Sequence, residues 1–202
     1  MAPAAIVSPS LLASDFARMA DEAKKVIDGG ADWLHLDIMD GHFVPNLTFG
    51  APVVKCLAKH TDAFLDCHLM VTNPGDYVEP LKDAGANMFT FHIEVDEDAA
   101  ALCDRARAAG MKAGVALKPD TPADAVHAIC DANKVDMVLV MTVGVSVQRV
   151  VQSRGAGAAR DQGGGGRRRR GGRDRERGGG GPVGADIRRV HGRQTSRGIR
   201  RG

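Results

Sequence analysis

Residues 34–46 read LHLDIMDGHFVPN, an apolar strand that carries two ligand-type side chains and runs into a loop marked by glycine and proline. Side chains alternate across a strand, so His35 and Asp37 point to one face while the apolar residues between them point to the other. An imidazole and a carboxylate at the end of a buried strand are costly to desolvate without a partner. A divalent metal ion is one partner that would stabilise both groups.

Residues 64–71, FLDCHLMV, repeat this arrangement, with Asp66 and His68 on one face of a second apolar run. A single buried histidine is usually held by a backbone carbonyl, which is the alternative interpretation for each strand. Two strands that each end in a histidine beside a carboxylate favour a metal site. Imidazole and carboxylate ligands suit zinc, iron, manganese or cobalt better than calcium or magnesium. The sequence therefore predicts one divalent transition metal.

The chain of 202 residues consists of two very different parts that join near Val143. Residues 1–143 contain 11 basic and 21 acidic side chains, a net charge of −10. Residues 144–202 contain 16 arginines, no lysine and 4 acidic side chains, a net charge of +12. The second part also has 17 glycines and no aromatic residue. We expect the first part to fold as one domain and the second to be disordered, because it cannot bury enough apolar surface.

The sequence indicates neither a secretory signal nor a membrane span. Residues 1–6 hold no basic segment followed by an apolar one. No apolar run approaches the roughly 18 residues that cross a bilayer. The four cysteines are scattered without a C-x-x-C pair, which suits a reducing compartment. We therefore expect a cytoplasmic protein with no membrane partner, and the sequence leaves a plastid location open.

Short apolar runs alternate with amphipathic segments throughout the first part of the chain. Six strands are expected, over residues 6–10, 33–37, 63–69, 88–92, 112–117 and 137–142. Five helices are expected between them, over residues 15–27, 52–59, 74–83, 98–108 and 122–132. Strict alternation means parallel strands joined by crossover helices. Polar residues gather at the strand ends, which favours a TIM barrel over a doubly wound sheet. A doubly wound sheet usually has a glycine-rich phosphate loop, and residues 8–12 are unlike one.

Four segments follow one another along the chain: SPSLLASD at residues 8–15, residues 34–48, DCHLMV at 66–71 and VLVMTV at 138–143. Together they resemble the ribulose-phosphate 3-epimerase family. The resemblance implies a TIM barrel of the ribulose-phosphate-binding type over residues 1–143. It also implies an isomerase that interconverts D-ribulose 5-phosphate and D-xylulose 5-phosphate in the pentose phosphate pathway and the Calvin cycle. The family's sister decarboxylases have a lysine in their D-x-K-x-x-D motif, and this chain has none there.

The resemblance implies roles for several of these residues. His35, Asp37 and His68 would bind the metal, and Asp37 would also be one of two acid/base groups. Epimerisation next to a ketone removes a proton from one face and returns one to the other, so both groups are needed, with stabilisation of the enediolate. Ser10 and His68 would contact the substrate, as would three methionines that line the reacting face: Met39, Met70 and Met141. Core filling is the alternative for the methionines.

Three further polar residues receive no catalytic role. Asp66, His92 and Lys118 are expected at solvated or hydrogen-bonded positions on the rim of the barrel. The family's second acid/base group is an aspartate in a V-D-G-G stretch, which has no counterpart here, and Asp186 is only a faint echo of it. The family's phosphate-binding turns are also missing after Val143. A TIM barrel usually needs roughly 250 residues. We therefore expect an incomplete barrel of about six strands with little or no epimerase activity.

Residues 144–202 allow two interpretations. The favoured one is a slip of reading frame near Val143, because a GC-rich message read out of frame yields mostly Gly, Arg, Ala and Pro. The alternative is an RNA-binding arm rich in arginine and glycine, although such arms gain from aromatic residues and this segment has none. The expected partner is a small sugar phosphate rather than nucleic acid, and the sequence is compatible with a homo-oligomer.

Overall fold

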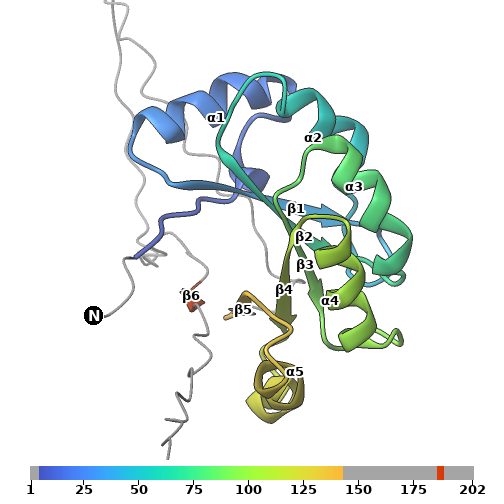
Figure 1. Cartoon of the computed structure of the whole chain (residues 1–202). Helices are drawn as coiled ribbons and strands as arrows, with labels where there is room; N and C mark the ends of the chain where they lie inside the picture. Colours follow the sequence, from blue (N-terminus) through green and yellow to red (C-terminus); the bar gives the residue numbers. More distant parts are fainter. Residues whose placement is uncertain (1–4, 143–185, 189–202) are drawn as a thin grey trace, which may run out of the picture.

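The computed structural model describes residues 5–142 and 186–188, and residues 5–142 form part of a TIM barrel (Figure 1). Five parallel strands lie side by side in the order of the chain. They are β1 (Trp33–Met39), β2 (Phe64–Met70), β3 (Met88–His92), β4 (Lys112–Leu117) and β5 (Met137–Val140). A doubly wound sheet reverses its strand order at a switch point. The continuous order from β1 to β5 therefore confirms the barrel over that alternative.

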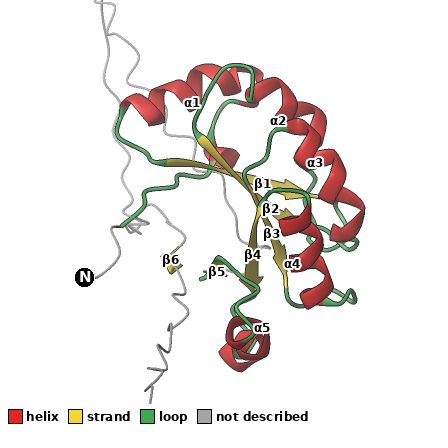
Figure 2. Ribbon diagram, viewed as in Figure 1, coloured by secondary structure: helices red, strands yellow, loops and turns green. Residues whose placement is uncertain are grey.

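The helices return along the outer side of the sheet (Figure 2). They are α1 (Met19–Asp28), α2 (Ala51–Leu57), α3 (Val78–Ala84), α4 (Ala99–Ala108) and α5 (His127–Asp131). Three of the expected helices begin as 3-10 turns: η2 (Phe16–Arg18), η3 (Pro74–Tyr77) and η4 (Ala123–Val126). Asp98 caps α4 by accepting from the N–H groups of Ala100 and Ala101. Gly85 ends α3 at φ 93°, a left-handed conformation that glycine adopts without strain.

The strand expected over residues 6–10 is reduced to a single bridge. Ser10 pairs in parallel with His35, and the N–H of His35 donates to the carbonyl of Pro9 at 3.0 Å. Pro9 has no N–H of its own, and Ser10 already caps the 3-10 turn η1 (Leu11–Ala13). These two features limit the pairing, so the expected strand is wrong as a strand. The segment still lies beside β1, where the first strand of the barrel belongs.

The short strand β6 (Asp186–Arg188) pairs with β5 in the antiparallel direction. We expected no strand in this part of the chain. An unpaired strand edge readily accepts another segment. Because β6 runs against β1 to β5, it does not continue the parallel barrel. Apart from β6, the prediction that residues 144–202 are disordered lies outside the described residues.

The inner side of the sheet is divided into three layers. One apolar layer contains Met88, Ala116, Met137 and Leu139, with Trp33 and Phe64 packed against it. Another contains Met39, Val44, Met70 and Met141. Between these two layers, β1 and β2 place buried polar residues. On β1 the polar residues are His35 and Asp37, which lie between Trp33 and Met39. The outer side packs strand residues such as Leu36, Leu69 and Phe91 against the helices. The polar layer therefore lies between two apolar layers, with the core that packs against the helices behind it.

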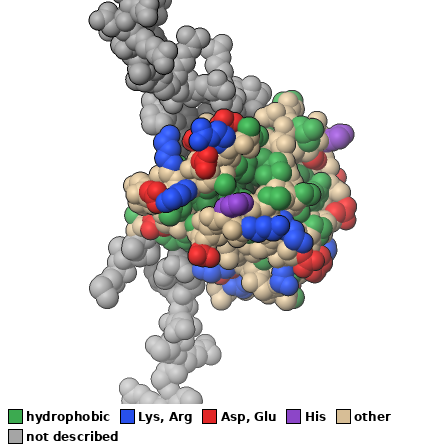
Figure 3. Space-filling view, turned by 90° about the horizontal axis from the view of Figure 1, so that it is seen from above, with side chains coloured by type: hydrophobic (Ala, Val, Ile, Leu, Met, Phe, Trp, Pro, Cys, Tyr) green, Lys and Arg blue, Asp and Glu red, His purple; other side chains and the backbone are tan. Residues whose placement is uncertain are grey.

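The helical surface carries charges of both signs. In Figure 3, basic and acidic side chains are interspersed around a stretch of hydrophobic residues. On α1 and the turn before it, Arg18 pairs with Asp21 at 2.9 Å and Lys24 pairs with Asp28 at 2.8 Å. These pairs are exposed and contribute little to stability. Within the described residues, none of the helices has the length and apolar character that crossing a membrane requires.

Candidate metal centre and active site

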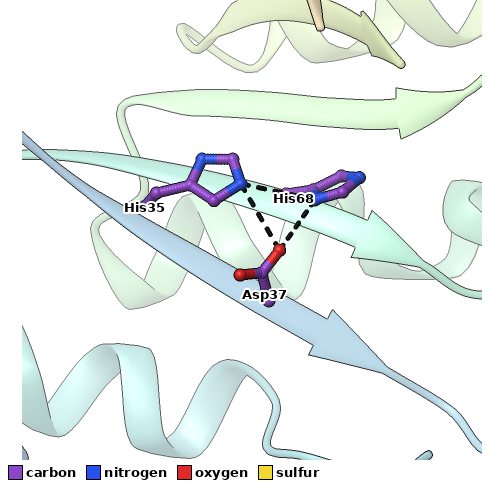
Figure 4. Close-up of side chains that lie close together, drawn as sticks. All are labelled: His35, Asp37 and His68. Atoms are coloured by element: carbon purple, nitrogen blue, oxygen red, sulfur yellow. Dashed lines mark hydrogen bonds and ion pairs between the residues drawn. The ribbon is translucent and has the colours of Figure 1, made fainter. Parts of the chain in front are cut away.

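The three predicted ligands meet in the buried polar layer (Figure 4). Asp37 Oδ1 lies 2.8 Å from His68 Nδ1 and 3.4 Å from His35 Nε2, and the two nitrogens are 3.3 Å apart. All three residues are buried: His35 and Asp37 each expose 4% of their surface, and His68 exposes 2%. The parallel register of β1 and β2, with Asp37 opposite His68, brings the two strands' side chains together.

The spacing of these atoms fits a transition metal. Two ligand atoms that each lie about 2.1 Å from a metal ion are about 3.0 to 3.4 Å apart at octahedral to tetrahedral angles. Two of the three distances lie in this range, and the 2.8 Å between Asp37 Oδ1 and His68 Nδ1 is slightly shorter. Two imidazole nitrogens and one carboxylate oxygen are also the donor set that zinc, iron, manganese and cobalt accept. A 2.8 Å contact between an imidazole nitrogen and a carboxylate requires a proton or a metal ion between them. His35, Asp37 and His68 therefore form a candidate metal site.

The charges of this group are strongly coupled. Burial by itself raises the pKa of Asp37, but the charges and hydrogen bonds of His35 and His68 outweigh it and hold that pKa well below its usual range. Burial likewise lowers the pKa of His35, but Asp37 and Asp66 outweigh it and raise that pKa well above its usual value. Asp37 is thus an ionised carboxylate, and its neighbourhood favours a positive charge at the point where the three side chains meet.

Ser10 also lies beside this group, and its expected contact with the substrate stays a prediction. Its hydroxyl donates to Asp37 Oδ2, the carboxylate oxygen that does not face the two histidines. The same hydroxyl oxygen accepts from the N–H of Leu12 at 3.1 Å, so the 3-10 turn η1 holds it in place. The two oxygens of Asp37 therefore have different surroundings, one beside imidazole nitrogens and one beside a hydroxyl.

The three predicted methionines lie together above this group. Met39, Met70 and Met141 form one cluster with Val44, and Leu12 and Phe43 pack against it. All three are nearly or fully buried. A contact with substrate and plain core filling would both place them here, so their proposed role at the reacting face stays a prediction.

Two residues expected at the rim are instead buried inside the barrel. Asp66 and His92 are both 0% exposed. Asp66 Oδ2 lies 2.8 Å from His35 Nδ1, and the hydroxyl of Thr90 donates to Asp66 Oδ1 at 2.7 Å. The expectation of hydrogen bonding is confirmed, but that of a rim position is wrong. Strand alternation was the available signal, because it places Asp66 on the same face as His68.

The third residue, Lys118, is half-buried at the end of β4. Its Nζ lies 3.7 Å from the centroid of the Phe43 ring, which is a cation–π contact. Its backbone N–H donates to Glu94 Oε1 at 2.7 Å. Glu94 was not singled out from the sequence, and it also accepts from the Thr121 hydroxyl and contacts His92.

His92 and Glu94 form a second coupled pair. Burial lowers the pKa of His92 to about 4, so this imidazole is neutral at ordinary pH. Burial raises the pKa of Glu94, but hydrogen bonds from His92, Thr121 and the Lys118 backbone outweigh it and bring it to about 2. A neutral imidazole and an ionised carboxylate therefore lie side by side, 2.9 Å apart.

The fold and site define an α/β protein of the TIM-barrel class, with an imidazole and carboxylate cluster near the carboxyl ends of the first strands. The sequence profile of the ribulose-phosphate 3 epimerase family matches residues 6–153. This chain belongs to that family. The match extends ten residues beyond Val143, where the motif resemblance ends.

Curated relatives support the same assignment. The cytoplasmic isoform of ribulose-phosphate 3-epimerase from Oryza sativa subsp. japonica is 60% identical over 144 residues, covering 70% of this chain and 63% of the rice protein. Ribulose-phosphate 3-epimerase from Schizosaccharomyces pombe is 49% identical over 140 residues, covering 68% of this chain and 60% of the yeast protein. The chain thus spans less than two thirds of the length of these relatives.

A solved structure supports the fold alone. A mutant tryptophan synthase alpha-subunit from Pyrococcus furiosus superposes with a TM-score of 0.51 at 16% sequence identity. The superposition covers 67% of this chain and 64% of the tryptophan synthase subunit. At this identity the likeness concerns the barrel and not the chemistry.

Proposed function

We propose that this protein is a sugar-phosphate epimerase that interconverts D-ribulose 5-phosphate and D-xylulose 5-phosphate. The observation that carries the proposal is the convergence of His35, Asp37 and His68 at one point of a barrel that belongs to the epimerase family. The curated relatives are named as epimerases, and none of those reported above is named as an RNA-binding protein. The rice relative's name also supports a cytoplasmic location for this protein.

In this proposal Asp37 is an acid/base group of the reaction. Its pKa is held well below the usual range, so the carboxylate is in the ionised form that a proton acceptor must have. The Ser10 hydroxyl orients Oδ2, the oxygen that faces away from the histidines. His35 and His68 would hold a divalent transition metal together with Asp37 Oδ1. When bound, such a metal supplies Lewis-acid stabilisation to the oxygen on which negative charge develops.

We also propose that this chain has little epimerase activity. Epimerisation needs an acid/base group on each face of the substrate, and Asp37 is the one carboxylate in the described three-residue cluster. We propose that residues 144–202 replace the segment that would provide the second group, through a slip of reading frame. Translation of the other two frames downstream of the Val143 codon tests this. If neither frame encodes a V-D-G-G stretch, the slip is refuted.

One acid/base group is enough for half of the reaction. It can remove the proton at the epimerising carbon from one epimer and return a solvent proton to the same face. We therefore expect the metal-loaded full chain in D₂O to exchange that hydrogen in only one of the two sugar phosphates, with little conversion to the other. NMR spectroscopy measures both processes in one sample.

Variants separate this activity from background exchange. Asp37→Asn should abolish the exchange because an amide does not accept the proton, whereas Glu79→Gln, an exposed change on α3, should leave it unaltered. Absence of exchange in both epimers would refute the proposed function. Conversion at the rate of an intact barrel would refute the proposed low epimerase activity.

A further inference from the structure

A buried row of contacts leads from the candidate metal site to the loop after β4. His68 Nε2 lies 3.0 Å from His92 Nε2, and His92 Nδ1 lies 2.9 Å from Glu94 Oε2. The other oxygen of Glu94, Oε1, accepts from the N–H of Lys118 at 2.7 Å and from the Thr121 hydroxyl. His92 is 0% exposed, so water does not replace these contacts. His68 and His92 must therefore find their donors and acceptors inside the protein.

The direction of every hydrogen bond in this row follows from its last member. Glu94 Oε1 accepts from the Lys118 backbone and the Thr121 hydroxyl, and the pKa of Glu94 is lowered to about 2, so this residue is an ionised carboxylate. A carboxylate accepts only, so His92 Nδ1 carries the hydrogen that points to Glu94 Oε2. A neutral imidazole has one N–H, so His92 Nε2 presents a lone pair toward His68. His68 must then donate from Nε2, because two lone pairs 3.0 Å apart would repel each other.

This direction matters at the opposite nitrogen of His68. Nδ1 is the atom that faces Asp37 Oδ1 at 2.8 Å, and it is free to bind a metal only if the permanent hydrogen is on Nε2. We propose that Glu94 is a positioning residue that acts through His92 to keep the hydrogen of His68 on Nε2, which leaves Nδ1 for a divalent metal ion. The inference rests on the metal site of the proposed function.

The other histidine has an equivalent but shorter arrangement. His35 Nδ1 lies 2.8 Å from Asp66 Oδ2, so the Asp66 carboxylate accepts that hydrogen and leaves His35 Nε2 for the metal. Thr90 in turn donates to Asp66 and holds its orientation. Each candidate ligand histidine therefore has its own buried or partly buried carboxylate, directly for His35 and through one imidazole for His68. Outer groups of this kind commonly fix the tautomer of metal-binding histidines.

The variant Glu94→Gln should reverse the direction of the hydrogen bonds between residue 94, His92 and His68. The backbone N–H of Lys118 still requires an acceptor, so the amide oxygen of Gln stays on that side and the NH₂ group faces His92. His92 Nδ1 then becomes an acceptor, its hydrogen moves to Nε2, and His68 Nε2 accepts instead of donating. The hydrogen of His68 moves to Nδ1, where it hydrogen-bonds to Asp37 and blocks the metal. The substitution removes no atom from the metal site itself.

The test measures tautomers and metal affinity on the full-length chain. In the wild type, ¹⁵N NMR of the histidine side chains should show the hydrogen of His92 on Nδ1, and in the zinc-loaded wild type it should show the hydrogen of His68 on Nε2. In metal-free Glu94→Gln, the hydrogens should be on His92 Nε2 and His68 Nδ1. Zinc affinity, measured by competition with a chelator, should fall by about 10- to 100-fold in this variant. The surface variant Glu79→Gln should change neither measurement.

The outcomes separate this inference from the proposed function. A wild-type His92 with its hydrogen on Nε2 overturns the inference, and so does a Glu94→Gln protein that keeps the wild-type tautomers or binds zinc as tightly. If the wild type binds no zinc, the proposed metal site fails, while the position of the hydrogen on His92 in the metal-free chain still decides the direction of the row. The wild-type spectrum is informative even if the variant does not fold.

Discussion

Replacing Gly114 by alanine should strongly destabilise the barrel. Gly114 on β4 pairs with Thr90 on β3. A Cβ atom at this position would lie 3.0 Å from Thr90 Cβ and 3.1 Å from its Cγ2, and closer still to its hydroxyl. Thr90 cannot turn away without loss, because its hydroxyl donates to the fully buried Asp66 at 2.7 Å. The added methyl group therefore forces either a clash or a broken hydrogen bond.

The magnitude follows from these two effects. Overpacking a dense interior costs about 1 to 3 kcal/mol. Loss of a hydrogen bond to a buried charged group costs about 1.5 to 3 kcal/mol. If Thr90 both shifts and loses its bond to Asp66, the free energy of unfolding should fall by about 2.5 to 6 kcal/mol. This is a large share of the stability of a typical domain.

Urea unfolding of the full chain, followed by circular dichroism, measures this effect. In a Thr90→Ala background the hydroxyl and methyl groups are already absent, so Gly114→Ala should cost much less there than in the wild type. Gly50→Ala is a control, since a Cβ there would meet only Pro52 Cδ at 3.9 Å. A Gly114→Ala protein within about 0.5 kcal/mol of the wild type, or additive effects in the double variant, would refute the packing argument.

Two further predictions concern titration. Cys56 is exposed and should be alkylated in the native protein, whereas Cys67 and Cys103 should react only after unfolding. The reason is that burial raises the pKa of Cys103 to about 12 and also raises the pKa of Cys67. Mass spectrometry of the labelled peptides checks this, and equal labelling of the three cysteines would contradict it. Zinc affinity should rise with pH by about tenfold per unit. The reason is that Asp37 and Asp66, against the effect of burial, raise the pKa of His35, whose proton the metal must displace. Calorimetry in buffers of different ionisation enthalpy counts that proton, and a pH-independent affinity would argue against it.

Much of the fold was predictable because the barrel repeats a simple local pattern. Alternating apolar runs and amphipathic segments located the strands and helices, with errors of a few residues at their ends. The exception was the segment before Leu11, where Pro9 and the capping role of Ser10 reduce a strand to one bridge. β6 was also unexpected, because its pairing depends on the edge of β5 and not on its own sequence.

The candidate site was predictable to the extent that strand alternation decides it. His35 and Asp37 on one strand, and His68 on the next, had to face the same side, and the barrel brings their tips together. The supporting residues were harder to recognise. Asp66 and His92 were expected at the rim, and Glu94 was not considered, because their partners come from other strands and from the loop after β4.

The chain alone determined which side chains share a face, since the two-residue period of a strand is a local property of the backbone. It also determined where helices begin and end, through caps and glycine stops. Only the tertiary structure decided which nitrogen of each histidine is available. For His35 that choice depends on Asp66, which is 31 residues away in the sequence. For His68 it depends on His92, which is 24 residues away, and through His92 on Glu94. Hydrogen-bond direction is set by such neighbours, and sequence spacing does not reveal them.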